Sequence, residues 1–534
     1  MTTSLTRSIT LLAAILTLCQ CGAPEPPTCS RVPLLSRTPA DRLISDARQA
    51  WSTLEKSPSA PEKSAALLKY NRSVAALFDQ LRCGPGSWND RASNLGTRIH
   101  TTDRTLADPQ SFDAIFPADD VSTGIVGERR TTPGIGLSLV GWRKTTPITV
   151  PRPPFHPPTG IPYSLTAVLD FDAPQPTWKL TKRWIVEETT VGKNRQTLDA
   201  DWSAAIAFYW QMSLLDDLTI QNVLLPERYM EETGLYFLQP YDPDKIPIVM
   251  VHGLKSSPDA FKRLINDLSP LPWFRENYQI WLFNYPTGNP WLYTGIQFRK
   301  YMEAAAKLAR SKGHDRNLNR MVVLCHSMGG LITRSSVTDP GNKLYDAHFE
   351  ARFEDLKVAP QTRTLIQEGL LYEPLDEPSR VVFMAVPHRG SPMANLRATM
   401  LIQNFIKLPK RLTVDLLDAA LHSGSGDAHR DLDKVSRKAP NSISSLSPES
   451  RGIVGLKKLP LPKHITFHSI IGDRGRGTLL QQSSDGVVPY WSSRLHGVAS
   501  EKIVPKNHGV PDCPEASKEV QRILKLHLRS STDH

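Results

Sequence analysis

The feature that most constrains the fold is a series of short apolar runs that alternates with helical patterns in the second half of the chain. The first run, KIPIVMVHG at residues 245–253, is almost continuously apolar. A strand buried on both faces of a parallel sheet has this character. Similar runs follow at residues 278–286, 319–327, 379–391, 464–473 and 501–509. Strands that alternate with helices predict an α/β fold with a doubly wound, mostly parallel sheet.

Changes of pattern along the chain predict two parts. The 534 residues exceed the length of one typical domain. The α/β pattern occupies residues 228–530 and is interrupted at about residues 395–463 by an insertion with apolar and amphipathic helical patterns. Residues 30–225 combine helical patterns with β-branched and aromatic stretches between Pro and Gly breaks. This combination predicts an N-terminal α+β accessory region.

Residues 1–21 predict an export signal. An apolar stretch at residues 9–18 follows Arg7; it is too short to span a bilayer and fits the apolar part of a signal peptide. Behind it, Cys21, or otherwise Cys19, resembles the lipidated cysteine of bacterial lipoproteins. We therefore expect an exported protein, periplasmic or anchored to the outer-membrane surface by its lipid. A cleaved, soluble exported protein is the alternative.

Cysteine usage and charge limit the classes of partner. Cys29 and Cys83 could pair in an oxidising compartment, although connectivity does not follow from sequence. No Cys/His spacing fits zinc, so we expect no metal and no cofactor. The net charge of +11 and the pI near 9.3 would suit an anionic membrane or nucleic acid. No basic run is interleaved with aromatic residues, so we expect no nucleic-acid partner.

The stretch MVVLCHSMGGLI places Ser327 between a strand pattern and a helical pattern. A nucleophilic serine needs a sharp turn of small residues, a base and N–H groups that face the developing oxyanion. Gly329 and Gly330 let the helix begin close behind the serine, and the N–H of Met328 would supply one oxyanion donor. Cys325 stands where such a turn usually has glycine, and it is still small. An ordinary structural turn is the alternative.

The loop after the first apolar run would supply the second oxyanion donor. In VMVHGLKSS, Gly253 lets the backbone turn and the N–H of Leu254 would face the substrate. We expect His252 to brace this loop, with a role as the base as the alternative. His326 and His388 are likewise expected to line or brace the pocket.

An acid and a base follow Ser327 in the chain order Ser, acid, His that this type of fold uses. Asp485, in SSDGVVP, would hold an imidazole in the required tautomer and stabilise its cation. His508, in VPKNHG, would be the base. The rival acid is Asp473. The rival histidines are His388, His468 and His496.

Together VHGL, HSMGG, PHRGSP, DGVVP and NHG stand in the order and approximate spacing of the α/β-hydrolase family, and the chain resembles its bacterial lipase/esterase branch over residues 245–512. The resemblance implies the nucleophile Ser327, the acid Asp485, the base His508 and the oxyanion donors Leu254 and Met328. It also implies that the insertion forms a lid, with packing into the core as the alternative. Some members bind calcium through an Asp two residues after the histidine; Val510 stands there, so we expect no calcium.

These observations predict a serine hydrolase that cleaves carboxylic esters through an acyl-enzyme. The substrate would be a small-molecule or lipid ester. An acyltransferase or amidase would use the same triad and is the first alternative. A surface lipoprotein that kept the fold for binding, without catalysis, is the second.

Overall fold

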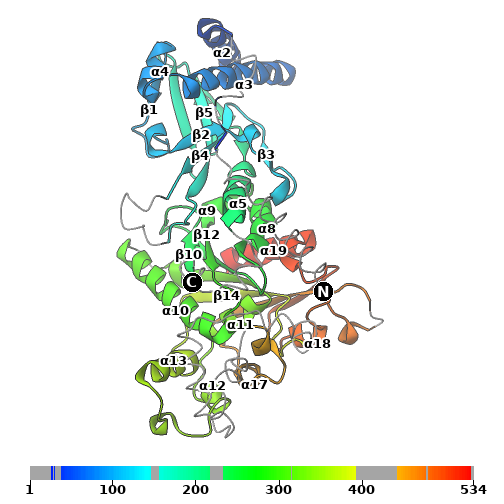
Figure 1. Cartoon of the computed structure of the whole chain (residues 1–534). Helices are drawn as coiled ribbons and strands as arrows, with labels where there is room; N and C mark the ends of the chain where they lie inside the picture. The colour runs from blue at the N-terminus through cyan, green and yellow to red at the C-terminus, as the bar shows by residue number, and fades with distance from the viewer. Residues whose placement is uncertain are drawn as a thin grey trace, which may run out of the picture. The chain divides into compact units, whose positions relative to one another are not determined.

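The computed structural model describes residues 26–27, 29, 38–145, 155–216, 233–313, 316–392, 442–476 and 479–530. The chain divides into two compact units (Figure 1): Met1–Arg152 with Thr159–Asp217, and Pro153–Pro158 with Leu218–His534. The expected export signal with Cys19 and Cys21, and residues 395–441 of the expected lid, lie outside the described residues. No helix among the described residues combines the length and apolarity needed to cross a membrane.

The first unit is built on a five-stranded sheet in the order β1-β6-β5-β4-β2. The β1–β6 pair is parallel and the other neighbours are antiparallel. Two short ladders, β3–β9 and β7–β8, accompany it. The strands are β1 Arg98–His100, β2 Ala114–Pro117, β3 Thr131–Thr132, β4 Leu137–Arg143, β5 Ile161–Asp170, β6 Thr177–Lys182, β7 Glu188–Val191, β8 Asn194–Thr197 and β9 Ala200–Asp201. The helices are α2 Ala40–Glu55, α3 Ala60–Cys83, α4 Trp88–Asn94 and α5 Ala204–Asp216.

The helices α2 and α3 pack against each other and bury one face in the core of this unit. Leu43, Ala47 and Trp51 lie one turn apart along α2 and are all buried, as their spacing predicts. Tyr70 of α3 reaches the sheet, where its hydroxyl donates to the carbonyl of Leu169 at 2.7 Å. The α+β character expected for this region is therefore present.

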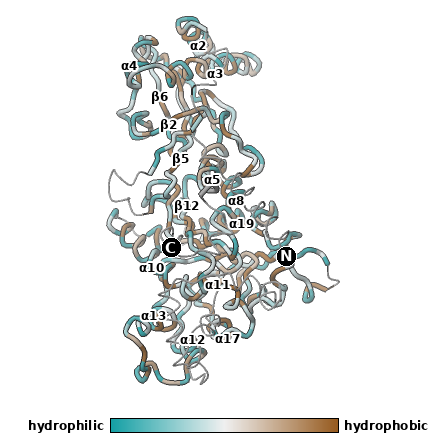
Figure 2. The backbone as a smooth tube through the Cα atoms, in the orientation of Figure 1, coloured by the Kyte–Doolittle hydropathy of each residue, from teal (hydrophilic) through white to brown (hydrophobic). Residues whose placement is uncertain are grey.

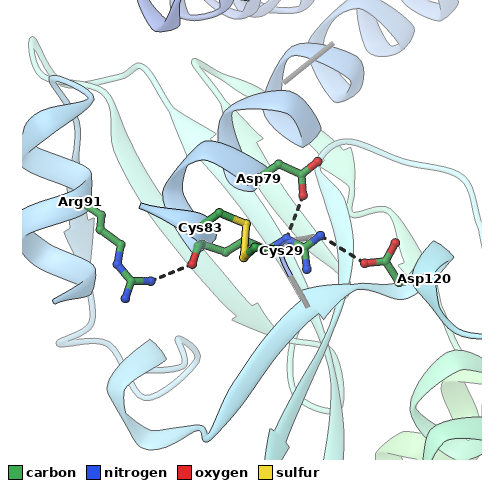
Figure 3. The surroundings of a disulfide bond; sticks show 6 residues. Cys29, Asp79, Cys83, Arg91 and Asp120 are labelled. Atoms are coloured by element: carbon green, nitrogen blue, oxygen red, sulfur yellow. Dashed lines mark hydrogen bonds and ion pairs between the residues drawn. A yellow bond between two sulfur atoms is a disulfide. The ribbon is translucent and has the colours of Figure 1, made fainter. Parts of the chain in front are cut away.

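A disulfide joins Cys29 to Cys83 at the end of α3 (Figure 3), which identifies the pairing that the sequence left open. Beside it the guanidinium of Arg82 bonds to the carboxylates of Asp79 at 2.8 Å and Asp120 at 3.2 Å. Arg91 donates to the carbonyl of Arg82 at 2.8 Å. Cys29 is thus covalently attached to a charged, hydrogen-bonded helix end.

Reduction of this disulfide is expected to lower the free energy of unfolding of the first unit by about 2–4 kcal/mol, because it frees a loop of 54 residues in the unfolded chain. Urea denaturation followed by tryptophan fluorescence, with and without reductant, measures the change. The double variant Cys29→Ala/Cys83→Ala is the matched control, since reductant should leave its transition unchanged. Equal transitions of the oxidised and reduced wild type would contradict the prediction.

The second unit is built on a seven-stranded sheet in the order β10-β12-β11-β13-β14-β15-β16. Only β10 runs antiparallel to its neighbour; the other six strands are parallel. The six parallel strands correspond to the six apolar runs of the sequence, which confirms a mostly parallel α/β sheet. The strands are β10 Gly234–Phe237, β11 Ile246–Val251, β12 Tyr278–Asn284, β13 Met321–His326, β14 Pro378–Met384, β15 Thr466–Gly472 and β16 Ser500–Val504.

Helices lie on both faces of this sheet: α8 and α19 on one, α10 and α11 on the other (Figure 1). Every residue of the central strands β11 and β13 is buried. Figure 2 shows hydrophobic residues along the strands at the centre of the unit. The helices are α8 Lys262–Leu268, α9 Pro272–Asn277, α10 Trp291–Ser311, α11 Met328–Ser336, α12 Lys343–Asp346, α13 Pro360–Leu370, α17 Arg451–Lys457, α18 Tyr490–Ser493 and α19 Pro514–Arg529.

The end of the expected lid insertion is described from residue 442 onward, and it packs into the core. Ile453 and Leu456 of α17, with Leu459, belong to the same buried cluster as Trp291 and Phe298 of α10. Residues 442–463 of the insertion thus contribute side chains to the core of this unit. The lid expected at about residues 395–463 stays a prediction.

Candidate active site

Ser327 occupies a sharp turn between β13 and α11. Its φ of 54° and ψ of −125° lie in a region that residues other than glycine rarely adopt. Such strain persists only where the surroundings enforce it, and it is concentrated at functional sites. A Cβ on Gly329 would stand 2.3 Å from the carbonyl oxygen of His252, and one on Gly330 would stand 2.1 Å from the side chain of Val386. Both glycines are therefore required for α11 to begin this close to its neighbours.

Replacement of Gly329 by alanine is expected to lower the free energy of unfolding by about 1–3 kcal/mol, because the new methyl meets backbone atoms that cannot rotate away. Chemical denaturation measures this loss. Gly369→Ala, in α13, is the matched control: its Cβ would meet only Ile296 at an ordinary 3.5 Å, and helix propensity predicts equal or slightly higher stability. Equal stability of both variants would contradict the steric argument.

Cys325, which stands where glycine was expected, is a buried packing residue. Its Sγ donates to the carbonyl of Val382 at 3.4 Å. Burial raises the pKa of the thiol well above its ordinary value, so it stays protonated. The departure from glycine therefore adds no second nucleophile next to Ser327.

The structure brings Ser327, His508 and Asp485 together in one hydrogen-bonded chain. The Nε2 of His508 lies 2.8 Å from the Oγ of Ser327, and its Nδ1 lies 2.7 Å from Oδ2 of Asp485. The other carboxylate oxygen accepts from the amides of Val487 and Val488 at 2.8 and 2.7 Å. Asp485 is buried, whereas the side chain of His508 is 22% exposed. In this arrangement the imidazole can accept the serine proton while the carboxylate holds its far nitrogen protonated.

Within the described part of the chain, no protein group accepts a hydrogen bond from the two amides expected to bind the oxyanion. Among the described residues, neither the N–H of Leu254 nor that of Met328 has a hydrogen-bond acceptor. Their loops lie close together, since a Cβ on Gly253 would stand 2.8 Å from the Cβ of Ser327. The hydroxyl of Thr287 accepts from the amide of Lys255 at 3.3 Å and so holds the loop beyond Leu254. Two N–H groups are thus free beside the serine.

His252 is placed to brace this loop and not to accept the serine proton. Its Nδ1 lies 3.0 Å from the carbonyl oxygen of Gly253, and its ring stacks on Tyr285 with centroids 4.1 Å apart. The hydroxyl of Tyr285 in turn donates to the carbonyl of His252 at 2.6 Å. Burial lowers the pKa of His252 to about 4, which keeps the ring neutral.

The other candidates for the acid and the base have different surroundings from Asp485 and His508. The carboxylate of Asp473 accepts from the amide of Gly475 in its own turn. His468 is bonded to Arg380 and Ser500, and burial lowers its pKa to about 4. His388 packs edge-on against a phenylalanine, and burial lowers its pKa. His496 is exposed.

His326 contacts the loop that carries His508 through an interaction that no sequence pattern indicated. Its Nε2 lies 2.7 Å from the backbone carbonyl oxygen of His508. Because a carbonyl only accepts, this nitrogen carries the proton. Burial, followed by the neighbouring His508, lowers the pKa of His326 to about 3, so the ring is neutral. Among the described residues, no cluster of three or more His, Cys, Asp or Glu side chains could hold a metal ion.

Comparison with known proteins shows likeness over half of the chain. No protein-family model matches the sequence, and no curated protein matches it significantly. Similar solved structures include the mature lipase BlEst2 of Bacillus licheniformis (16% identity, 54% of this chain and 97% of that chain, TM-score 0.31) and the lipase of Staphylococcus hyicus (14%, 55% and 98%, TM-score 0.34). Lipase 1 from Pelosinus fermentans is a third (14%, 51% and 95%, TM-score 0.30). Because these identities and TM-scores are low, the assignment of the fold and of the site rests on the strand order and the contacts described above.

Proposed function

We propose that the chain is a serine hydrolase of the α/β-hydrolase fold that cleaves carboxylic esters through an acyl-enzyme on Ser327. The observation that carries this proposal is the unbroken hydrogen-bonded chain from Ser327 through His508 to Asp485. Its serine sits on a strained turn beside two free amides. A structural turn has no need of all these features together.

In the first half of the reaction, the Oγ of Ser327 attacks the ester carbonyl and its proton passes to Nε2 of His508. The oxyanion accepts hydrogen bonds from the amides of Leu254 and Met328. Asp485 stabilises the imidazolium. When the tetrahedral intermediate collapses, the C–O bond to the alcohol breaks and the alcohol takes the proton from His508. The acyl group remains on Ser327.

In the second half, His508 takes a proton from a water molecule as that water attacks the acyl-enzyme. The same two amides hold the second oxyanion. Collapse breaks the bond to Ser327, which regains its proton from His508, and releases the carboxylic acid. An alcohol or amine in place of water would make the protein an acyltransferase, since the residues used are the same.

Turnover of p-nitrophenyl esters from acetate to palmitate tests this proposal in the purified protein. We expect release of p-nitrophenol, with the acyl-chain length of the best substrate distinguishing an esterase from a lipase. Added alcohol that yields a new ester as the main product would favour an acyltransferase, and faster cleavage of the matching anilide would favour an amidase. No turnover of any of these substrates would favour a binding protein.

We propose further that the protein is exported and anchored through Cys21. The Cys29–Cys83 disulfide supports an oxidising compartment. Incorporation of labelled palmitate during bacterial expression tests the anchor. Incorporation should be lost in Cys21→Ala and kept in Cys19→Ala; the reverse pattern would identify Cys19 as the anchor, and no incorporation in the wild type would refute lipidation.

A further inference from the structure

The loop that carries His508 makes few hydrogen bonds to distant parts of the chain. Within Pro505–Gly509, most of the hydrogen bonds are local: the amide of Lys506 to Val504, its ammonium to Asp512, and the amide of Gly509 to the side chain of Asn507. Residues 505–507 also line an open hollow of about 590 Å³, so they are not closed in by packing there. Among the described residues, the loop is hydrogen-bonded to more distant parts of the chain through His508 alone.

Within the described ranges, three hydrogen bonds from other parts of the chain hold His508, and one of them holds its backbone. Asp485 and Ser327 bond to the two ring nitrogens. His326 donates to the backbone carbonyl at 2.7 Å. Because His326 belongs to β13, at the centre of the sheet, and immediately precedes Ser327, two consecutive residues hold the backbone and the ring of the base. The backbone of His508 is thereby held by the residue that directly precedes the nucleophile, while Asp485 and Ser327 hold its ring.

We propose that His326 is a positioning residue: its Nε2–H fixes the backbone of His508 so that the imidazole stays within hydrogen-bond distance of Ser327. This inference rests on the proposed serine hydrolase. It assigns the neutral tautomer with the proton on Nε2, since Nδ1 of His326 is buried and has no partner among the described residues. A neutral ring is also required because the ring centroids of His326 and His508 are 4.9 Å apart, where a second charge would repel the catalytic imidazolium.

Three substitutions at His326 distinguish the effect of losing the N–H donor from the effect of losing the imidazole ring. In His326→Gln the amide nitrogen reaches about as far as Nε2, so the bond to His508 can form. In His326→Asn the amide nitrogen stops near the position of Nδ1, and in His326→Leu there is no donor. We expect Asn and Leu to lower kcat about 10–100-fold, as small displacements of a catalytic group do, with KM within about twofold of the wild type. Gln should restore kcat to within about fivefold.

The comparison of Asn with Gln carries the test, because both are polar and differ only in reach. Equal kcat in all variants, or equal losses in Gln, Asn and Leu at unchanged stability, would overturn the proposal. A readout that needs no substrate is the ¹⁵N NMR spectrum of the wild type: Nε2 of His326 should be protonated and Nδ1 bare from pH 5 to 8. The opposite tautomer would overturn the proposal even if hydrolysis is observed. Absence of wild-type hydrolysis would instead overturn the proposed function.

Discussion

Replacing Ser327 with alanine is expected to lower kcat for ester hydrolysis by a factor of about 10⁵–10⁶, the loss seen when the nucleophile of such a triad is removed. His508→Ala should cost about as much, and the double variant Ser327→Ala/His508→Ala no more than either one. The physical reason is that the two groups act in one step: without the base the hydroxyl is a weak nucleophile, and without the hydroxyl the base has no proton to accept.

The measurement is initial-rate kinetics on the best p-nitrophenyl ester, with each variant's folding checked by thermal unfolding. Stability should be retained in Ser327→Ala, because alanine keeps the same Cβ on the strained backbone and loses only one hydroxyl. Losses that multiply in the double variant would mean that Ser327 and His508 act independently. That result would contradict the hydrogen-bonded unit.

The second large effect is expected from Asp485→Asn, which should lower kcat about 10⁴-fold at neutral pH. The amides of Val487 and Val488 both point at one oxygen of Asp485, so the asparagine must keep its oxygen there. Its NH₂ group then faces Nδ1 of His508 and donates to it. This forces the imidazole proton onto Nε2, which faces Ser327 and can no longer accept the serine proton.

The matched control for this variant is Asp473→Asn. Asp473 bonds within its own turn, so kcat should stay within about twofold of the wild type. Steady-state kinetics compares the two variants, and ¹⁵N NMR of His508 reports the tautomer. A variant Asp485→Asn that retains most of its activity, or an active-site effect of Asp473→Asn of similar size, would contradict the assignment of the acid.

The parallel sheet could be predicted because each of its six parallel strands is buried on both faces and therefore appears as an uninterrupted apolar run. The strand β10 was not predicted: its four residues, GLYF, are too few to show a period. The stretch TWKLTKRWIVEETT forms two strands separated by a turn at Arg183. This arginine is fully buried; it donates to the carbonyl of Val186 and lies over the ring of Trp202. A buried cation held by a backbone group leaves no mark in the hydrophobic pattern.

Some features of the site could likewise be predicted from the sequence, and others could not. Ser327, Asp485 and His508 follow predicted strands, and the carboxyl ends of parallel strands meet at one edge of a sheet, so their proximity could be predicted. The bond from His326 to His508 could not, because it joins a side chain to a backbone carbonyl 182 residues away and any residue provides such a carbonyl. Whether the end of the insertion covers a pocket or, like α17, joins the core could not be predicted, because an apolar helix pattern is the same in both cases.

The central claim is that Ser327 is the residue that becomes acylated. Labelling of the purified wild-type protein with a fluorophosphonate, followed by tryptic digestion and mass spectrometry, tests it most directly. The account predicts one adduct, on Ser327, that is absent in Ser327→Ala and forms about 10²–10⁴-fold more slowly in His508→Ala, whose serine has lost its general base. An adduct on another residue, or labelling of Ser327→Ala at the wild-type rate, would contradict it.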